Sequence, residues 1–172
     1  MKHYILAAVA ITSLCLSPIL FASETKANVE QASVTDNVEN FYFGLSDKIN
    51  NGEYETAIKM VEEHFSSDFM HYDDGAPVYG KEEMISMLKR DMEQGTRTQM
   101  DIKIHETQFD DATNEVTTKF YIQQRFYNTS NKHGNPNKTI AMTCNDTFRV
   151  TDAENFELYK CDCLTADPTT PE

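Results

Sequence analysis

Three side chains that could transfer protons or bind a metal ion stand out from their local patterns. His71 and Asp73 alternate with Tyr72, so a strand would carry both on one face. An imidazole beside a carboxylate can act as a general base or ligate a metal, whereas the alternative is a solvated acidic edge. Asp146 is the third, because it interrupts an apolar strand pattern. We predict His71 and Asp146 as the catalytic candidates.

The surroundings of Asp146 decide what it can do. Its strand face is otherwise apolar and comprises Met142, Cys144, Phe148 and Val150. A carboxylate buried there must be paired, hydrogen-bonded or protonated, because burying it alone costs several kcal/mol. An ion pair with Lys160 is one outcome. The other is a raised pKa, which would suit a proton donor or base for enolisation, dehydration or cyclisation with His71 as partner.

Further polar and aromatic groups are candidates for the same space. Gln124 lies on an apolar strand face that includes Phe120. If Tyr127 pairs with Thr139 across the intervening loop, Gln124 faces Met142 and Phe120 faces Asp146, so that all four share one face. Tyr42 and Tyr79 could add hydroxyl groups. We predict four ligand-binding residues: Gln124, Tyr79, Tyr42 and Phe120.

Several functions lose support from motifs and charge. The chain has no Gly-rich phosphate loop, no paired metal motif and no nucleophile elbow, and we predict neither a metal nor a cofactor. Its formal net charge of −13 disfavours nucleic acid as a partner, since phosphate binding needs a basic face. Anionic membrane surfaces are disfavoured for the same reason.

The first residues have the order of a secretory signal peptide. Lys2 and His3 precede an apolar run, followed by Pro18 and the small residues Ala22 and Ser23. We predict a signal peptide over residues 1–22, a periplasmic or secreted protein, and no stable membrane anchor after cleavage. Residues 23–35 are expected to be a flexible leader and residues 166–172 a disordered tail.

Between these ends, residues 36–165 show helical periods first and strand alternation afterwards. Helices are predicted over residues 36–52, 53–65 and 81–95, and strands within residues 67–75, 98–105, 119–127, 139–150 and 156–165. Residues 76–80 lead into the third helix. Helices followed by a long meander indicate an α+β domain with the helices on one face of an antiparallel sheet.

This order resembles the nuclear transport factor 2-like superfamily, in particular its SnoaL-like branch. The stretch that most resembles that branch is residues 68–92 (DFMHYDDGAPVYGKEEMISMLKRDM). The resemblance implies a strongly curved antiparallel sheet that wraps three helices into a cone with an internal cavity. It also implies binding of a small, partly apolar molecule, with isomerisation, cyclisation or dehydration among the family's reactions. The alternative is a non-enzymatic periplasmic interaction or scaffold module that uses the outer face of the sheet.

The family often forms dimers through the sheet. A mixed aromatic and basic row, which includes Tyr121, Arg125 and Tyr127, lies on the outer face of the predicted third strand. Such a row suits an interface rich in Tyr and Arg. We therefore expect a homodimer through the sheet.

Three cysteines follow the predicted signal peptide, an odd number for an oxidising compartment. If a four-residue loop over 152–155 lets Thr151 pair with Phe156, Cys144 faces Cys163. A shift of one residue instead puts Lys160 opposite Asp146 and turns these two cysteines to opposite faces. We predict the disulfide Cys144–Cys163 with Cys161 free, while Cys161 remains the alternative partner of Cys144.

Overall fold

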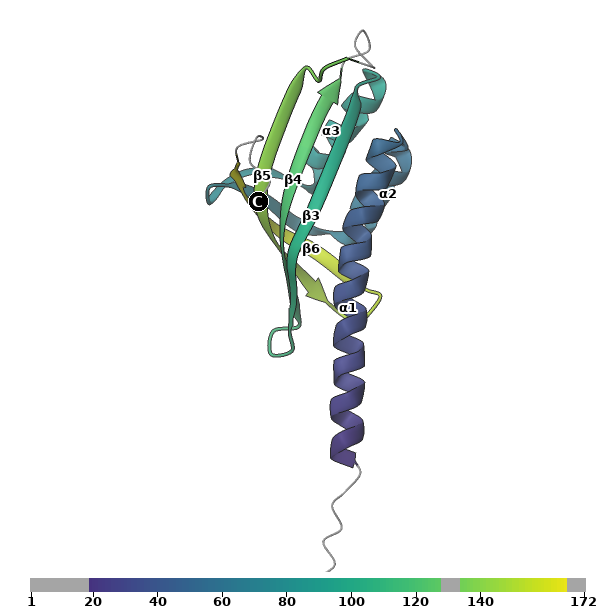
Figure 1. Cartoon of the computed structure of the whole chain (residues 1–172), viewed down its shortest axis with the longest axis vertical. Coiled ribbons are helices and arrows are strands. Elements are labelled where there is room, and N and C mark those ends of the chain that lie inside the picture. Colours follow the sequence, from purple (N-terminus) through teal and green to yellow (C-terminus); the bar gives the residue numbers. More distant parts are fainter. Residues whose placement is uncertain (1–18, 128–133, 167–172) are drawn as a thin grey trace, which may run out of the picture.

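The computed structural model describes residues 19–127 and 134–166. The tail beyond residue 166 and most of the predicted signal peptide lie outside these ranges. In chain order the elements are α1 (Ile19–Asn50), α2 (Tyr54–His64), β1 (Phe65–Asp73), β2 (Ala76–Gly80), α3 (Lys81–Glu93), β3 (Arg97–Asp110), β4 (Glu115–Tyr127), β5 (Lys138–Val150) and β6 (Phe156–Thr165). Figure 1 shows long strands beside α1, with α3 behind the sheet.

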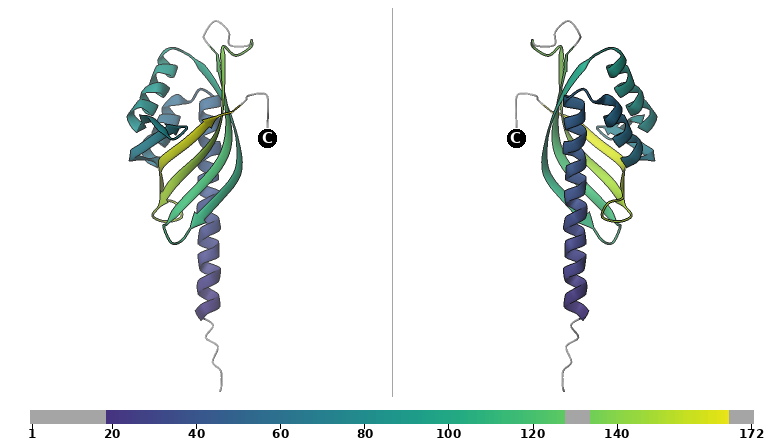
Figure 2. Two further views of the ribbon diagram at one scale, coloured as in Figure 1. Left: turned by 90° about the vertical axis from the view of Figure 1, so that its left-hand side faces the viewer. Right: turned by 90° about the vertical axis from the view of Figure 1, so that its right-hand side faces the viewer.

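One six-stranded sheet, in the order β2-β1-β6-β5-β4-β3, forms the second layer of the fold. Neighbouring strands are antiparallel except β1 and β6, which run parallel. The prediction of a wholly antiparallel sheet was therefore wrong at this junction. Sequence alternation marks strands but does not say that the last strand inserts beside the first. The two side views in Figure 2 show the strands bending around one side of the helices.

α1 begins before the predicted domain start. Val34 is 2% exposed and continues the buried stripe of Val38, Phe41 and Leu45 by one more turn. Residues 23–35 are thus helical in the structure, whereas their polar sequence predicted a flexible leader. A polar segment can extend a helix whose next turns are fixed by packing, because propagation costs less than nucleation. Gly52, with φ of 74°, follows the end of α1 and leads into α2.

β2 is a strand where the sequence predicted only a lead into α3. It pairs with β1 through a two-residue turn at Asp74 and Gly75, which both have positive φ (51° and 74°). An Asp-Gly pair is a preferred sequence for such a hairpin turn, because both positions need left-handed backbone. The hairpin places Tyr79 opposite His71.

The register between β4 and β5 differs from the prediction by two residues. Gln124 faces Ile140, Phe120 faces Cys144, and Asp146 faces Thr118. The predicted partners Met142 for Gln124 and Asp146 for Phe120 were wrong. Because the shift is even, it moves no side chain to the other face of the sheet, so Gln124 and Asp146 still share one.

β5 and β6 combine both registers that the sequence left open. Near their loop Val150 pairs with Phe156, as in the one-residue shift. An irregularity after Thr147 leaves Tyr159 without a register partner and restores the other pairing, so Cys144 faces Cys163. These two cysteines form a disulfide across 19 positions of sequence, and Cys161 is free.

No helix in the described ranges is long and apolar enough to cross a membrane.

We predict that exported protein lacking residues 1–22 has one free thiol. Alkylation of denatured, non-reduced protein should modify Cys161 alone, and Cys161→Ser should abolish the labelling. Reduction should expose two more thiols, with the disulfide contributing about 3 kcal/mol to stability on the chain-entropy estimate. Three reactive thiols without reductant would contradict the bridge.

Candidate functional site

A buried hydrogen bond between α1 and β5 forms the inner end of the site. The Tyr42 hydroxyl donates to Asp146 Oδ2 at 2.5 Å, and the two residues are 4% and 2% exposed. Tyr42 also packs its ring 4.8 Å from that of Phe120. Lys160 pairs with Asp162 on β6, so the predicted ion pair with Asp146 is not made.

Burial raises the pKa of Asp146 to about 7, while hydrogen bonding from Cys161 and Tyr42 opposes the rise. The Cys161 thiol is a weak donor, and Asp146 Oδ1 has no hydrogen bond of normal geometry in the described part of the chain. Burial and the Asp146 charge together raise the pKa of Tyr42, which therefore stays a neutral donor. Near neutral pH, Asp146 can consequently either accept or release a proton.

A polar row crosses the sheet at the level of Asp146, and each member faces the next on the neighbouring strand. We call Tyr79, His71, Cys161, Asp146 and Thr118 the polar row. His71 stacks on the Tyr79 ring at 4.4 Å, and its Nδ1 lies 3.3 Å from Cys161 Sγ. The row therefore connects His71 to Asp146 through the Cys161 thiol.

His71 is suited to accept a proton rather than to carry a permanent charge. Burial lowers its pKa, and the charges of Asp73 and Asp162 partly oppose this shift. Asp73, predicted on the same strand face, is exposed and acts on His71 through its charge. At neutral pH the imidazole is thus mainly uncharged.

His71 and Cys161 of the polar row lie close to Cys163, but these three residues do not form a metal site as they stand. Ligand atoms of His71, Cys161 and Cys163 lie within 4.8 Å of one another. However, the Cys163 sulfur belongs to the disulfide and is not available as a thiolate. Burial and the Asp146 charge also raise the pKa of Cys161 well above its usual range.

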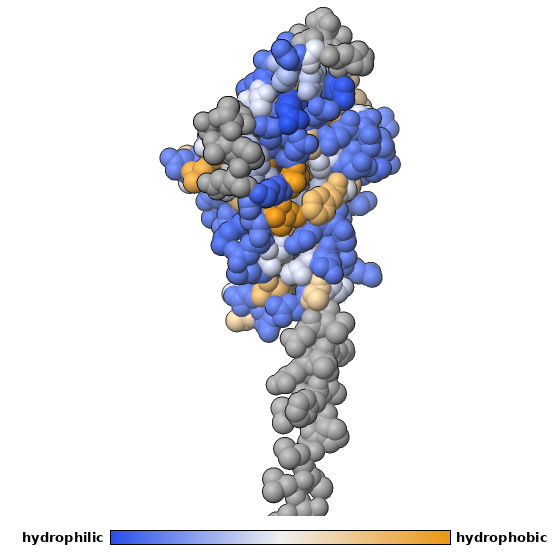
Figure 3. Space-filling view, viewed as in Figure 1, coloured by the Kyte–Doolittle hydropathy of each residue, from blue (hydrophilic) through white to orange (hydrophobic). Residues whose placement is uncertain are grey.

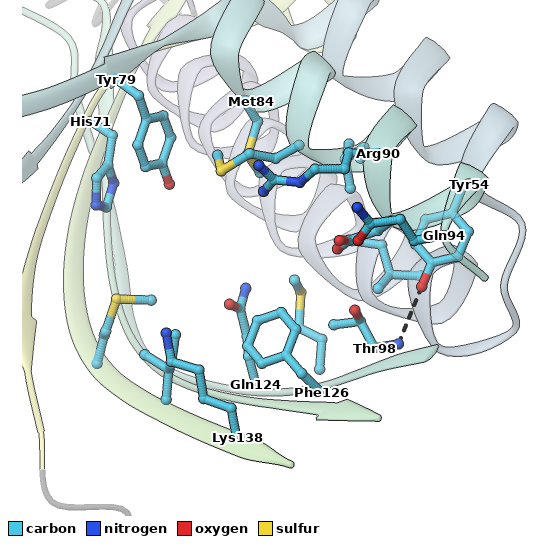
Figure 4. Close-up of a pocket in the computed structure, with 17 residues that line it drawn as sticks. Tyr54, His71, Tyr79, Met84, Arg90, Gln94, Thr98, Gln124, Phe126 and Lys138 are labelled. Carbon is cyan, nitrogen blue, oxygen red and sulfur yellow. Dashed lines mark hydrogen bonds between the residues drawn. The ribbon is translucent and has the colours of Figure 1, made fainter. Parts of the chain in front are cut away.

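An open pocket of about 550 Å³ lies between α3 and the sheet. Figure 4 shows His71 and Tyr79 at one end of it, Tyr54 and Thr98 at the other, and Met84 and Arg90 between them. A smaller apolar space of about 80 Å³ is lined by Tyr42 and Asp146. The two spaces share six lining residues: His71, Tyr79, Met84, Met100, Gln124 and Met142. The Asp146 end is therefore the inner end of the pocket.

The structure brings together the six residues predicted as catalytic or ligand-binding, while Asp73 lies outside the group. His71, Asp146, Gln124, Tyr79, Tyr42 and Phe120 all line the inner space. Their roles in binding and catalysis remain predictions. Sequence reasoning missed Cys161 as a neighbour of His71, since only the parallel β1–β6 pairing places it there. That Cys161 faces Asp146 follows from the same β5–β6 register that pairs Cys144 with Cys163.

Sequence reasoning also missed three residues of the pocket wall, namely Thr98, Arg90 and Lys138. Thr98 is 4% exposed, and its Oγ1 has no hydrogen-bond partner in the described ranges. Its position in an alternating strand was the available signal, because a polar residue aligned with Met100 and Ile102 is unusual. Arg90 and Lys138 gave no such signal, since charged residues at element ends are common.

We predict that Asp146 makes stability depend on pH. A carboxyl group whose pKa rises on folding, here from 3.8 to about 7, stabilises the folded state fully below the unfolded value. This contribution is lost as pH rises through about 7. Relative to Asp146→Asn, the wild-type free energy of unfolding should fall by at most about 4 kcal/mol over this window in urea titrations.

The matched control is Asp111→Asn, which changes an exposed carboxylate. Its stability curve should run parallel to that of the wild type. Parallel curves for Asp146→Asn as well would show that Asp146 has no raised pKa.

No family model and no curated protein matches this sequence. Its structure is similar to an NTF2-like protein of Shewanella oneidensis at 12% identity, covering 76% of this chain and 98% of that one, with a TM-score of 0.56. A scytalone dehydratase-like protein of Novosphingobium aromaticivorans gives 16% identity, 77% and 83% coverage, and a TM-score of 0.57.

A third similar structure comes from Catenulispora acidiphila and was solved in complex with S-DNPA. It gives 14% identity, 78% and 95% coverage, and a TM-score of 0.52. Identities this low establish a shared fold and carry no activity across. This chain has the nuclear transport factor 2-like fold, as its sequence resemblance predicted.

Proposed function

We propose that this chain is an exported, SnoaL-like domain that binds a small, partly apolar molecule in the pocket and transfers a proton at its inner end. In this proposal the curved sheet and the helices form the cone, and its cavity receives the ligand. The pocket volume of about 550 Å³ falls in the usual range for small-molecule sites. The protein acts after export, so its mature start lies near Ser23, which the intact mass of exported protein would test.

The single observation that carries the proposal is the Asp146–Tyr42 pair at the inner end of an open pocket. A carboxyl group with a pKa of about 7 can change protonation within one catalytic cycle. The inner space around it is mainly apolar, so a ligand there is shielded from water. Protein dipoles act more strongly in such surroundings than in water.

The arrangement suits proton removal next to a carbonyl group. Asp146 as a carboxylate would take a proton from carbon, and the C–H electron pair would move toward the carbonyl oxygen. Tyr42 donates to Asp146 and orients it. His71 is uncharged and lines the same space, and it would relay the proton or return it to the ligand. Isomerisation, cyclisation and dehydration of carbonyl compounds can each begin with such a step.

Neighbouring polar atoms can bind the polar part of a ligand. Asp146 Oδ1 belongs to a residue that lines the inner space, and it is buried without a hydrogen-bond partner in the described ranges. Buried polar atoms are normally hydrogen-bonded. Gln124 adds an amide to the wall nearby.

A second candidate function uses the outer face of the sheet as an interaction surface or homodimer interface. Figure 3 shows this face as mainly hydrophilic, with a small hydrophobic group near its middle. Arg125 pairs with Asp101 at 2.7 Å, and the Tyr127 hydroxyl donates to Gln99 at 3.0 Å. Contacts within the sheet thus already engage this row, which favours the pocket as the working site. Light scattering would test the homodimer.

We predict that filling the pocket blocks ligand binding. Ile140 lines the pocket, and its neighbour Thr139 points to the other face of β5. Ile140→Trp should weaken binding of the neutral fluorophore N-phenylnaphthylamine by about five-fold or more, since a clash of this size costs at least about 1 kcal/mol. Thr139→Trp is the matched control and should leave affinity within about two-fold. Equal effects of both variants would count against the pocket.

We predict that Asp146 catalyses proton exchange on a bound ketone. In deuterated buffer at neutral pH, the wild type should accelerate exchange of the α-hydrogens of β-tetralone, followed by mass spectrometry. Asp146→Asn should lose about 100-fold of this rate, the usual size of a general-base contribution. Asp111→Asn should retain it. Binding of the ketone without any acceleration would leave a binding protein and refute the catalytic part.

A further inference from the structure

The wall of the pocket carries two cations in a protein that is strongly acidic. Arg90 near the end of α3 and Lys138 at the start of β5 both line the pocket, whereas the whole chain has a formal net charge of −13. Figure 4 shows them on opposite sides of the pocket, Arg90 beside Met84 and Lys138 below Gln124. Both are exposed, so they lie where the pocket opens to solvent.

The negative charge at this opening does not balance the two cations. Asp91 is the one acidic residue on the wall of this pocket, within the described ranges. Burial raises the pKa of Asp91, and the Arg90 charge opposes that shift. Neither Arg90 nor Lys138 forms an ion pair in the part of the chain that the structure describes. Two cations against one carboxylate give this lining a formal net charge of +1, with His71 neutral.

Between this opening and the inner end the wall is mainly apolar. The side chains there belong to Met84, Leu88, Met100, Phe126, Ile140 and Met142. At the end of the pocket with Tyr54, Thr98 Oγ1 is buried without a hydrogen-bond partner in the described ranges and lies on the pocket side in Figure 4. Such an atom is a ready contact for a polar group of a ligand.

We propose that the ligand is a small amphipathic organic anion, with its apolar body inside the pocket and its anionic group between Arg90 and Lys138. This inference rests on the proposed function and adds the ligand's charge and direction. The two cations reach the anion from opposite walls, so they fix its orientation as well as its affinity. The end of the ligand opposite the anion then lies against Asp146, where a second anionic group would be repelled above neutral pH.

Two fluorophores with the same ring system test whether the pocket prefers an anionic ligand. Anilinonaphthalene sulfonate is an anion, and N-phenylnaphthylamine is its neutral counterpart. The wild type should bind the anion more tightly. Arg90→Gln and Lys138→Gln should each weaken binding of the anion by about three- to five-fold, the usual range for a solvent-exposed charge pair, and change neutral binding by less than about two-fold.

The charge-matched control is Lys89→Gln, on the same helix but outside the pocket lining. It should change neither affinity by more than about two-fold. If Lys89→Gln weakens the anion as much as Arg90→Gln does, net charge explains the effect and the inference is overturned. It is also overturned if both probes bind equally in all variants.

The same experiment separates this inference from the proposed function. If the neutral probe binds the wild type and Ile140→Trp weakens that binding, ligand binding in the pocket is supported even when the preference for the anion is absent. If neither probe binds, the proposed function and this inference fail together. Raising the salt concentration should weaken binding of the anion more in the wild type than in a variant that combines Arg90→Gln and Lys138→Gln, because salt screens exposed charges.

Discussion

The burial of one carboxyl group constrains the rest of the site. Asp146 is 2% exposed, and its Oδ2 depends on a hydroxyl that α1 supplies from 104 positions earlier in the chain. An unpaired carboxylate would cost several kcal/mol at this position. The helix must therefore lie at the height on the sheet that brings Tyr42 to Asp146. Packing of Tyr42 against Phe120 and Phe148 holds its ring in the same place.

The irregularity in β6 makes this arrangement compatible with the disulfide. With an uninterrupted register from the loop, the cysteines would point to opposite faces and Lys160 would face Asp146. The extra residue, Tyr159, instead turns Cys161 toward Asp146 and Cys163 toward Cys144. A weak thiol donor thus replaces a cation beside the carboxyl group. The pKa of Asp146 stays high for that reason, since a neighbouring ammonium would have lowered it.

The sequence predicted the side of the sheet on which a residue lies better than it predicted the residue's partner on the neighbouring strand. Alternation put Gln124 and Asp146 on one side of the sheet correctly, even though their partners were two residues off, because side-chain direction repeats every second residue. The parallel insertion of β6 beside β1 was not predictable from local periodicity, and it brings His71 next to Cys161, which the β5–β6 register places opposite Asp146. The β2 strand was missed although Asp74 and Gly75 carried its hairpin signal. Nonlocal pairing, then, decides which predicted residues become neighbours.

The two ends of the pocket impose opposite electrostatic conditions on one ligand. The inner end disfavours charge, as the raised pKa of Asp146 and Tyr42 shows, because burial there removes water. The opening favours an anion through Arg90 and Lys138, which remain in contact with solvent. A ligand with charge at one end only satisfies both conditions in a single orientation. That orientation directs its uncharged end to Asp146, the group best placed to exchange a proton with it.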